Sequence, residues 1–230
     1  MKKVTIVLLF FVVGLAARAQ SINGAWEMKI GNEYVTVLAT GNYFTYTAYS
    51  SQPAEFHSTW GGPYKIIDDE IVVDVEFNSA EADEVGEEKR LSVIFHSDEL
   101  IKVTGQPFKR LDNNDETALA SGWQISKRAT PSGEMRAIAP AARKTLKILT
   151  GTRFQWIAMN TETGEFSGTG GGTYTLTEGV YTEHIKFFSR DNSRVGASLS
   201  FNAEVGGDDW LHSGKSSKGQ PIKEVWSKIE

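Results

Sequence analysis

The stretch GNYFTYTAYSSQPAEFHSTWGGPYKI (41–66) occurs a second time in altered form, as GTRFQWIAMNTETGEFSGTGGGTYTL (151–176). At a constant offset of 110 residues, nine positions carry identical amino acids. The matched positions are Gly41, Phe44, Ala48, Glu55, Phe56, Thr59, Gly61, Gly62 and Tyr64, opposite Gly151, Phe154, Ala158, Glu165, Phe166, Thr169, Gly171, Gly172 and Tyr174. So many matches in the same order indicate a duplicated unit.

Shorter matches extend the duplication on both sides. They are GAWEM (24–28) with SGWQI (121–125), LSVIF (91–95) with ASLSF (197–201), and FKRL (108–111) with WSKI (226–229). We therefore predict two copies, residues 21–112 and 120–230, joined by the polar link DNNDETALA (112–120).

Each copy contains about eight short runs in which apolar and polar residues alternate. In the first copy they lie near 24–30, 34–39, 42–50, 56–67, 70–78, 89–96, 99–104 and 107–111. The runs are rich in Thr, Val, Tyr, Phe and Trp and are separated by Gly, Asn, Asp and Ser, which is typical of strands and turns. Eight antiparallel strands in such a short unit favour a small closed up-and-down barrel, because closure removes exposed sheet edges. The predicted fold class is all-β, with two such barrels in tandem.

Three motifs add a family resemblance to this pattern. They are Gly24-Ala25-Trp26 in the first strand, an aromatic-Gly-Gly turn in the middle of the unit, and the closing EVWSKIE (224–230). Together they resemble the compact lipocalin-like domains of the calycin superfamily, above all uncharacterised secreted proteins of Bacteroidota. In the second copy the motif is Ser121-Gly122-Trp123, shifted from the usual spacing. The resemblance implies lipocalin-like barrels with a cavity for a small ligand, and it implies no particular reaction.

The first nineteen residues have the pattern of a secretory signal peptide. Lys2 and Lys3 precede an apolar run of twelve residues (4–15), and Ala17-Arg18-Ala19 forms a cleavage site. Cleavage after Ala19 predicts a periplasmic or secreted protein. Since the chain has no cysteine, it is not expected to be a lipoprotein or to form disulfides. The run is too short for stable membrane insertion.

The charge balance and the absence of certain motifs argue against several kinds of partner and active site. The whole chain has 24 basic and 29 acidic residues, and removal of Lys2, Lys3 and Arg18 leaves 21 basic residues against 29. This acidic balance argues against nucleic acid as a partner. The four histidines form no metal-binding motif, so no metal site and no cofactor are predicted. No serine lies in a nucleophile-elbow motif.

Because the unit is duplicated, each ionisable residue can be compared with the residue at the same position of the other copy. Alternation assigns one face of the strand 71–77 to the barrel interior, namely Ile71, Val73, Val75 and Phe77. Their counterparts are Tyr181, Glu183, Ile185 and Phe187. Glu183 is therefore expected inside the second barrel, where the first has a valine. His184 replaces Asp74 and is expected to face solvent.

An aromatic cavity is expected around Glu183. By the same alternation its lining is Phe154, Trp156, Tyr174, Tyr181 and Phe201. Trp210 and His212 align with Leu100 and Lys102, so His212 faces inward if Leu100 does. The predicted ligand-binding residues are Glu183, His212, Trp156, Tyr174, Tyr181 and Phe154. Two interpretations of Glu183 stay open: a hydrogen bond that closes the barrel, or a ligand-binding or acid–base carboxylate.

Two further segments differ between the copies. The second copy inserts TPSGEMRAIAPAAR (130–143), which could be a lid over the cavity or a loop that packs on the outside. The stretch WLHSGKSSKG (210–219) ends like a phosphate-binding loop, but Asp209 occupies the position of the first glycine and a strand follows. We therefore interpret it as part of the last hairpin.

Three functions remain possible from the sequence. The first is a secreted protein that binds a small, partly apolar molecule in the second barrel. The second is an enzyme (a hydrolase, lyase or isomerase) that uses Glu183 and His212 as an acid–base pair. The third is an interaction module with two solid barrels whose surface binds a glycan or an envelope protein.

Overall fold

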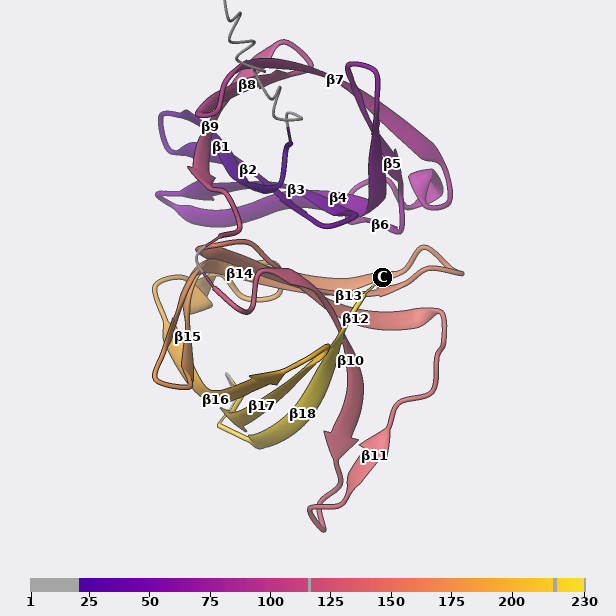
Figure 1. The fold of residues 1–230 in the computed structure, drawn as a ribbon, viewed down its shortest axis with the longest axis vertical. Helices are drawn as coiled ribbons and strands as arrows, with labels where there is room; N and C mark the ends of the chain where they lie inside the picture. Colours follow the sequence, from indigo (N-terminus) through magenta and orange to yellow (C-terminus); the bar gives the residue numbers. More distant parts are fainter. Residues whose placement is uncertain (1–20, 116, 217–218, 230) are drawn as a thin grey trace, which may run out of the picture.

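The computed structural model describes residues 21–115, 117–216 and 219–229. The predicted signal peptide (1–19) and its cleavage site lie outside these residues. The described chain is almost entirely β, with two short 3-10 helices, η1 (Ala82–Glu84) and η2 (Asn192–Arg194). No helix in these three ranges has the length and apolar character needed to cross a membrane. Figure 1 shows two rings of strands, one from each half of the chain.

Barrel 1 is formed by residues 24–112. Its strands are β1 (Gly24–Ile30), β2 (Glu33–Thr40), β3 (Tyr43–Ser51), β4 (Ala54–Ile67), β5 (Glu70–Asp74), β6 (Phe77–Asn78), β7 (Glu88–Ser97), β8 (Leu100–Val103) and β9 (Gln106–Asp112). Strands adjacent in the chain pair antiparallel, and β1 pairs with β9 to close the ring. Because β5 and β6 together fill one position, the ring has eight strands, and the predicted closed barrel is confirmed.

Barrel 2 repeats this topology in residues 121–228. Its strands are β10 (Ser121–Ala129), β11 (Met135–Ala137), β12 (Arg143–Leu149), β13 (Arg153–Asn160), β14 (Phe166–Thr177), β15 (Val180–Phe188), β16 (Ser198–Gly206), β17 (Asp209–Lys215) and β18 (Pro221–Lys228). The ring closes between β10 and β18. β11 pairs only with β10 and lies outside the ring.

The tryptophan of each Gly-x-Trp motif is fully buried in its barrel. Trp26 and Trp123 have no exposed surface. Each indole N–H donates a hydrogen bond of 2.8 Å to the carbonyl four residues earlier, that of Ile22 or Leu119. In both copies the tryptophan of this motif therefore packs within the apolar core, and the same type of backbone hydrogen bond holds its ring in place.

A bulge corrects the predicted orientation of Phe77 and Phe187. The pairing of β14 with β15 shifts register between Gly171 and Gly172, which leaves Lys186 without an opposite residue. Such an extra residue moves every following side chain to the other face. Phe187 therefore packs on barrel 1, and Phe77 lies in an apolar cluster between the barrels. The prediction that both rings face the barrel interior is wrong.

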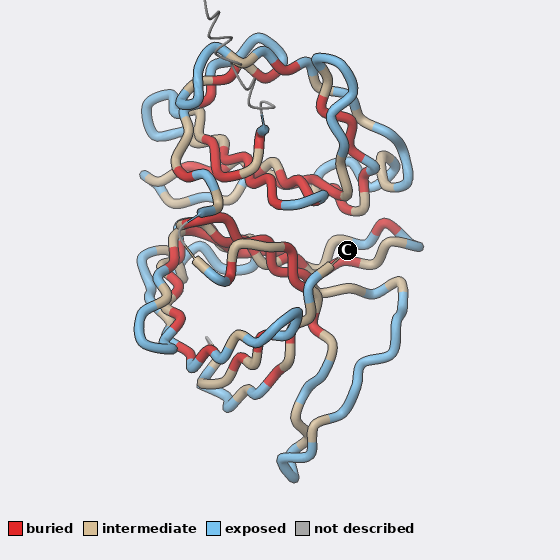
Figure 2. The backbone as a smooth tube through the Cα atoms, viewed as in Figure 1, coloured by how far each residue is buried: buried red, intermediate tan, exposed pale blue. Residues whose placement is uncertain are grey.

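The barrels contact each other through their outer faces, and buried residues line this contact (Figure 2). The interbarrel cluster consists of Ala25, Leu38, Tyr43, Phe77, Leu146, Ile148, Ile157 and Met159. Polar contacts cross the same boundary. The Gln155 amide donates to the Thr59 hydroxyl at 2.9 Å and accepts from Thr47 at 3.1 Å. The two barrels are thus joined by packing as well as by the linker.

Asp112, the last residue of β9, connects barrel 1 to the β12–β13 turn. Its buried carboxylate accepts hydrogen bonds from the backbone N–H groups of Ala25, Gly151 and Thr152 and from the hydroxyls of Thr150 and Thr152. The distances are 2.8–3.1 Å. A residue predicted to begin a polar link is therefore a buried contact between the barrels.

The inserted segment 130–143 forms an arm that extends from β10 through β11 (Figure 1). Ile138 is 42 % exposed. Ile138 and Pro140 border a groove between the barrels, and none of the residues 130–143 lines the cavity inside barrel 2. The prediction of a lid over that cavity is wrong, and the segment packs on the outside instead.

Candidate functional site

Three ionisable residues in barrel 2 occupy positions that are valines in barrel 1. The strand pairings match Lys147 with Val37, Glu183 with Val73, and His212 with Val103. The three valines are at most 1 % exposed and belong to the barrel 1 core. Their counterparts are equally enclosed: Lys147 is 5 % exposed, Glu183 4 % and His212 2 %. The two barrels thus share one fold, but these interior positions are apolar in barrel 1 and ionisable in barrel 2.

Part of the sequence alignment behind His212 needs correction. The structural matches are Trp210 with Ile101, His212 with Val103 and Phe201 with Leu91, in place of Leu100, Lys102 and Phe95. The pairing of β7 with β8 contains a bulge that the pairing of β16 with β17 lacks, so the offset between the copies is 109 residues for Trp210 and His212. Phe201 keeps the offset of 110, in place of the 106 that matches LSVIF with ASLSF. His212 nevertheless faces the interior, because its true counterpart is a core valine.

The interior of barrel 2 is an open cavity of about 730 Å³. Its lining includes Lys147, Glu183, His212, Glu224, Trp156, Ile185, Phe188, Leu199, Phe201, Ile222 and Trp226. Arg128, Arg190, Asp191 and Arg194 also border it. The volume and the mixture of apolar surface with a few polar groups are typical of small-molecule sites.

Glu183 forms a buried ion pair with Lys147. The Lys147 Nζ lies 2.7 Å from Glu183 Oε1, and both side chains are at most 7 % exposed. Four aromatic rings surround the ammonium group, with centroids at 4.9 Å (Tyr181), 5.1 Å (Trp210), 5.3 Å (Trp226) and 5.7 Å (Phe201). Cation–π attraction in a desolvated site offsets part of the cost of burying the charge.

His212 lies beside a second buried carboxylate, that of Glu224. The His212 Nδ1 is 3.7 Å from Glu224 Oε2, beyond hydrogen-bond range, and neither ring nitrogen has a hydrogen-bond partner among the described residues. Burial and the Lys147 charge lower the pKa of His212, so the ring is neutral near pH 7. A neutral imidazole offers one donor and one acceptor to a bound molecule.

Glu224 stays ionised because cationic and hydrogen-bonding neighbours surround it. Burial raises the pKa of this carboxyl group, but the nearby His212 ring and the positive charges of Arg128 and Lys147 outweigh that effect and leave the pKa below its ordinary value. Arg128 Nη2 lies 3.0 Å from Glu224 Oε1, and the Trp226 indole donates to Glu224 Oε2 at 3.2 Å. The His212 and Glu183 side chains form no direct hydrogen bond, so the predicted acid–base pair is not assembled in this structure.

The other predicted binding residues occupy two layers. Trp156 lines the cavity, packs edge-on against Phe188 and lies 5.6 Å below the Arg190 guanidinium. Tyr174 and Tyr181 lie behind the lining. The Tyr174 hydroxyl donates to a backbone carbonyl at 2.6 Å, whereas burial and Glu183 raise the pKa of Tyr181 well above its ordinary value.

Phe154 also belongs to this second layer. Its ring packs edge-on against Tyr181, and the residue lines a different cavity, between the barrels. The six predicted residues therefore converge on one region, but only Glu183, His212 and Trp156 line the interior cavity.

Sequence reasoning missed Lys147 and Glu224. Lys147 lies four residues before Gly151, where the constant offset of 110 still holds and aligns it with Val37. Extending the alignment by one strand would have found it. Glu224 carried no such signal, since its counterpart Gln106 is an exposed polar residue.

The glycine-lysine-serine stretch belongs to the antiparallel hairpin of β17 and β18, which confirms the interpretation as the last hairpin. Two residues of its turn (217–218) lie outside the described part of the chain. His184 accepts or donates a hydrogen bond of 2.8 Å with the exposed Ser198 hydroxyl, in keeping with its predicted solvent-facing position. Over residues 21–115, 117–216 and 219–229, His, Asp and Glu form no group of three suited to a metal ion.

Comparison with known protein families finds a match in the second half of the chain. Residues 118–230 match the model of DUF4488, which is described as a domain of unknown function. The match covers barrel 2, the barrel that contains the polar cavity. No curated protein matches the chain. Two closed eight-stranded barrels in tandem fit a lipocalin-like fold.

Proposed function

We propose that barrel 2 binds a small, partly apolar molecule in its interior cavity. The observation that carries this proposal is the replacement of three core valines by Lys147, Glu183 and His212 around an open space of about 730 Å³. The resemblance to lipocalin-like domains of the calycin superfamily supports the same function.

Folding alone does not account for the polar interior. Barrel 1 closes the same eight strands around valines, so the topology does not require charges inside. Replacing a buried ion pair by well-packed apolar residues is often neutral or stabilising, by up to about 4 kcal/mol. A barrel that retains the pair and leaves space beside it gives up stability, which is typical of a binding site.

The lining defines the chemistry of the ligand. Phe188, Leu199 and Ile222 offer apolar surface to the body of the molecule. A neutral His212 offers a donor and an acceptor, and these match a head group such as a hydroxyl, an amide or a protonated acid. Binding of such a group satisfies two buried nitrogens whose desolvation costs about 1–3 kcal/mol each.

Mass spectrometry of small molecules released from the purified native protein tests this proposal. We expect a bound molecule in the wild type and at least about tenfold less in the double variant Lys147→Val/Glu183→Val, which copies barrel 1 and leaves no unpaired charge. His212→Val is expected to weaken binding as well. The control is His57→Val, at an exposed histidine of barrel 1.

A fluorescence titration with the neutral apolar probe N-phenyl-naphthylamine provides a second measurement. The probe should bind the wild type near the cavity tryptophans and bind the double variant more weakly. Circular dichroism establishes that each variant is folded. Equal ligand content and equal probe affinity in the folded double variant would show that these residues do not form the site.

A further inference from the structure

The two barrels meet around an approximate twofold axis. Phe56 stacks on its own counterpart Phe166, with parallel rings 6.4 Å apart. β2 contacts its counterpart β12, and Gln155 donates to both Thr59 and the equivalent Thr169. Contacts between equivalent residues are what a twofold relation produces. The interface therefore has two equivalent sides, and each side contains a cleft.

The first cleft, of about 400 Å³, lies between β1–β3 of barrel 1 and β13–β15 of barrel 2. The second cleft, of about 410 Å³, is its symmetry counterpart. Six lining positions correspond through the strand pairings: Glu27 with Gln124, Tyr34 with Lys144, Thr36 with Leu146, Arg153 with Tyr43, Thr173 with Pro63, and Lys186 with Glu76. The second cleft thus serves as an internal control for the first.

In the second cleft, an ion pair joins the two barrels. Lys144 Nζ lies 2.7 Å from Glu76 Oε1, and the Tyr43 hydroxyl donates to Glu76 Oε2 at 3.0 Å. Burial and the Glu76 charge raise the pKa of Tyr43 well above its ordinary value, so the hydroxyl keeps its proton and remains a donor. Lys144, Glu76 and Tyr43 therefore satisfy one another across this cleft.

The first cleft has no ion pair at the equivalent positions of the described chain. Where the second cleft has Glu76 and Tyr43, it has the cations Lys186 and Arg153. No carboxylate of the described residues lies within 4.0 Å of either cation, and the Arg153 Nη1 bonds only to its neighbour Thr152. Glu27 is the acidic residue of the lining, and burial raises its pKa although Arg153 and Lys29 oppose the effect.

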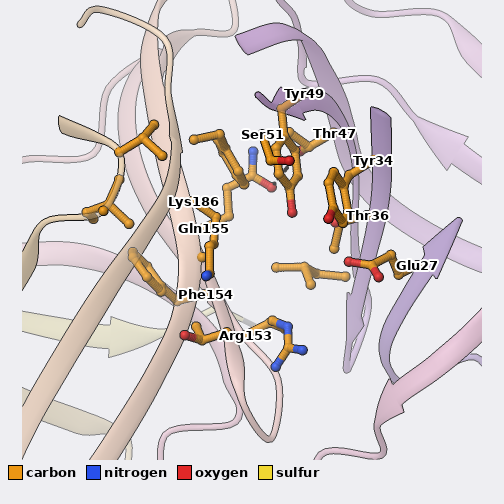
Figure 3. A pocket seen from close by; sticks show the side chains of 17 residues that line it. Glu27, Tyr34, Thr36, Thr47, Tyr49, Ser51, Arg153, Phe154, Gln155 and Lys186 are labelled. Atoms are coloured by element: carbon orange, nitrogen blue, oxygen red, sulfur yellow. Dashed lines mark hydrogen bonds between the residues drawn. The ribbon is translucent and has the colours of Figure 1, made fainter. Parts of the chain in front are cut away.

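The wall opposite the cations combines flat apolar surface with one buried hydroxyl group. Tyr34 stacks on Tyr49 with a centroid distance of 5.3 Å, and Phe187 extends this surface 5.0 Å from Tyr49. The Thr36 hydroxyl is buried without a hydrogen-bond partner in the described structure. Figure 3 shows Tyr34, Tyr49 and Thr36 on barrel 1 facing Arg153 and Gln155 on barrel 2.

We propose that the first cleft is a second binding site, for a small organic anion with a flat apolar body. Arg153 and Lys186 bind the carboxylate or phosphate group by charge-assisted hydrogen bonds. The body of the molecule lies against the Tyr34–Tyr49 pair. The Thr36 hydroxyl completes the polar contacts. Because both barrels contribute, the site exists only in the tandem protein.

Calorimetric titration of the full chain with phenyl phosphate and benzoate tests this site, with benzamide as the neutral comparison. We expect both anions to bind and benzamide to bind at least about tenfold more weakly, since it lacks the charge that the cations recognise. Tighter binding of phenyl phosphate identifies a phosphate site, and tighter binding of benzoate a carboxylate site.

Variants that copy the second cleft sharpen the test. Lys186→Glu and Arg153→Tyr should each weaken anion binding about tenfold or more, whereas Glu27→Gln should strengthen it by removing a like charge. Lys223→Glu, at an exposed position of barrel 2, changes the net charge by the same amount as Lys186→Glu and should have no effect. The variant Lys147→Val/Glu183→Val should also bind the anions normally.

Four results would overturn the proposal. Three are benzamide binding as tightly as the anions, Lys186→Glu behaving like Lys223→Glu, and Glu27→Gln weakening anion binding. The fourth is loss of anion binding in the Lys147→Val/Glu183→Val variant, which would place the anions inside barrel 2. Thermal unfolding of each variant establishes that the comparisons concern folded protein.

Discussion

At the scale of single residues, protonation of the barrel 2 interior decides which molecules it can accept. Lys147 and Glu183 neutralise each other, while Glu224 is held as an anion beside a neutral His212. The cavity therefore presents few unpaired charges, although eight ionisable residues line it. Such an interior suits a ligand with a polar but uncharged head group, in contrast to the cationic cleft between the barrels.

His212 should make the stability of the protein depend on pH. Its folded-state pKa lies below the ordinary value of 6.5, so the unfolded chain takes up a proton first as the pH falls. The free energy of unfolding should therefore decrease as the pH falls through 6.5. Urea unfolding at several pH values measures this slope, and His212→Val should flatten it. An unchanged slope in that variant would contradict the buried neutral imidazole.

At the scale of strands, the paired glycines explain how each barrel accommodates a bulge. The backbone of β14 approaches β15 so closely that a Cβ on Gly172 would overlap the carbonyl oxygen of His184. The equivalent Gly62 meets the Asp74 carbonyl in the same way. In barrel 2 the register shift between β14 and β15 lies at these shared glycines, between Gly171 and Gly172. Because these glycines have no side chain, the two strands approach closely at the bulge, and the bulge directs Phe187 away from the interior of barrel 2.

Gly172→Ala should therefore destabilise the protein by about 1–3 kcal/mol, since a rigid backbone atom must move to admit the methyl group. Gly206→Ala is the control, because a Cβ at that position meets no atom within 4 Å. Denaturant unfolding of both variants measures the difference. Equal stability of the two variants would show that the close approach in β14 is not needed.

At the scale of the whole molecule, the two barrels share a packed interface in addition to the linker. The interbarrel cluster, the Gln155 contacts and the Asp112 hydrogen bonds all cross the boundary between the repeats. Since the first cleft needs both barrels, their fixed relation is also a condition for the second binding site proposed above. A flexible tandem would not keep two halves of a small site in register.

Asp112→Ala should loosen this relation. Removing the carboxylate leaves donors of both barrels without an acceptor, which should cost about 2–4 kcal/mol and separate one thermal transition into two. Asp115→Ala is the matched control, because Asp115 is exposed. Differential scanning calorimetry measures both effects. A single transition at the wild-type temperature in Asp112→Ala would contradict the role of this contact.

The duplication and the strand alternation are local patterns, so the sequence by itself determined the two barrels, their eight-strand topology and the inward position of Glu183. The inward position of His212 required the structure, because the sequence matched this residue with the wrong position of barrel 1. The tertiary structure alone decided the partners: Lys147 for Glu183, Glu224 for His212, and barrel 1 for Phe187. It also decided that one outer face of each barrel is buried against the other barrel. The two clefts at this interface differ in the charge of their lining residues. The physical reason is that bulges shift side-chain register and that packing joins residues far apart in the chain, and neither effect leaves a periodic trace in the sequence.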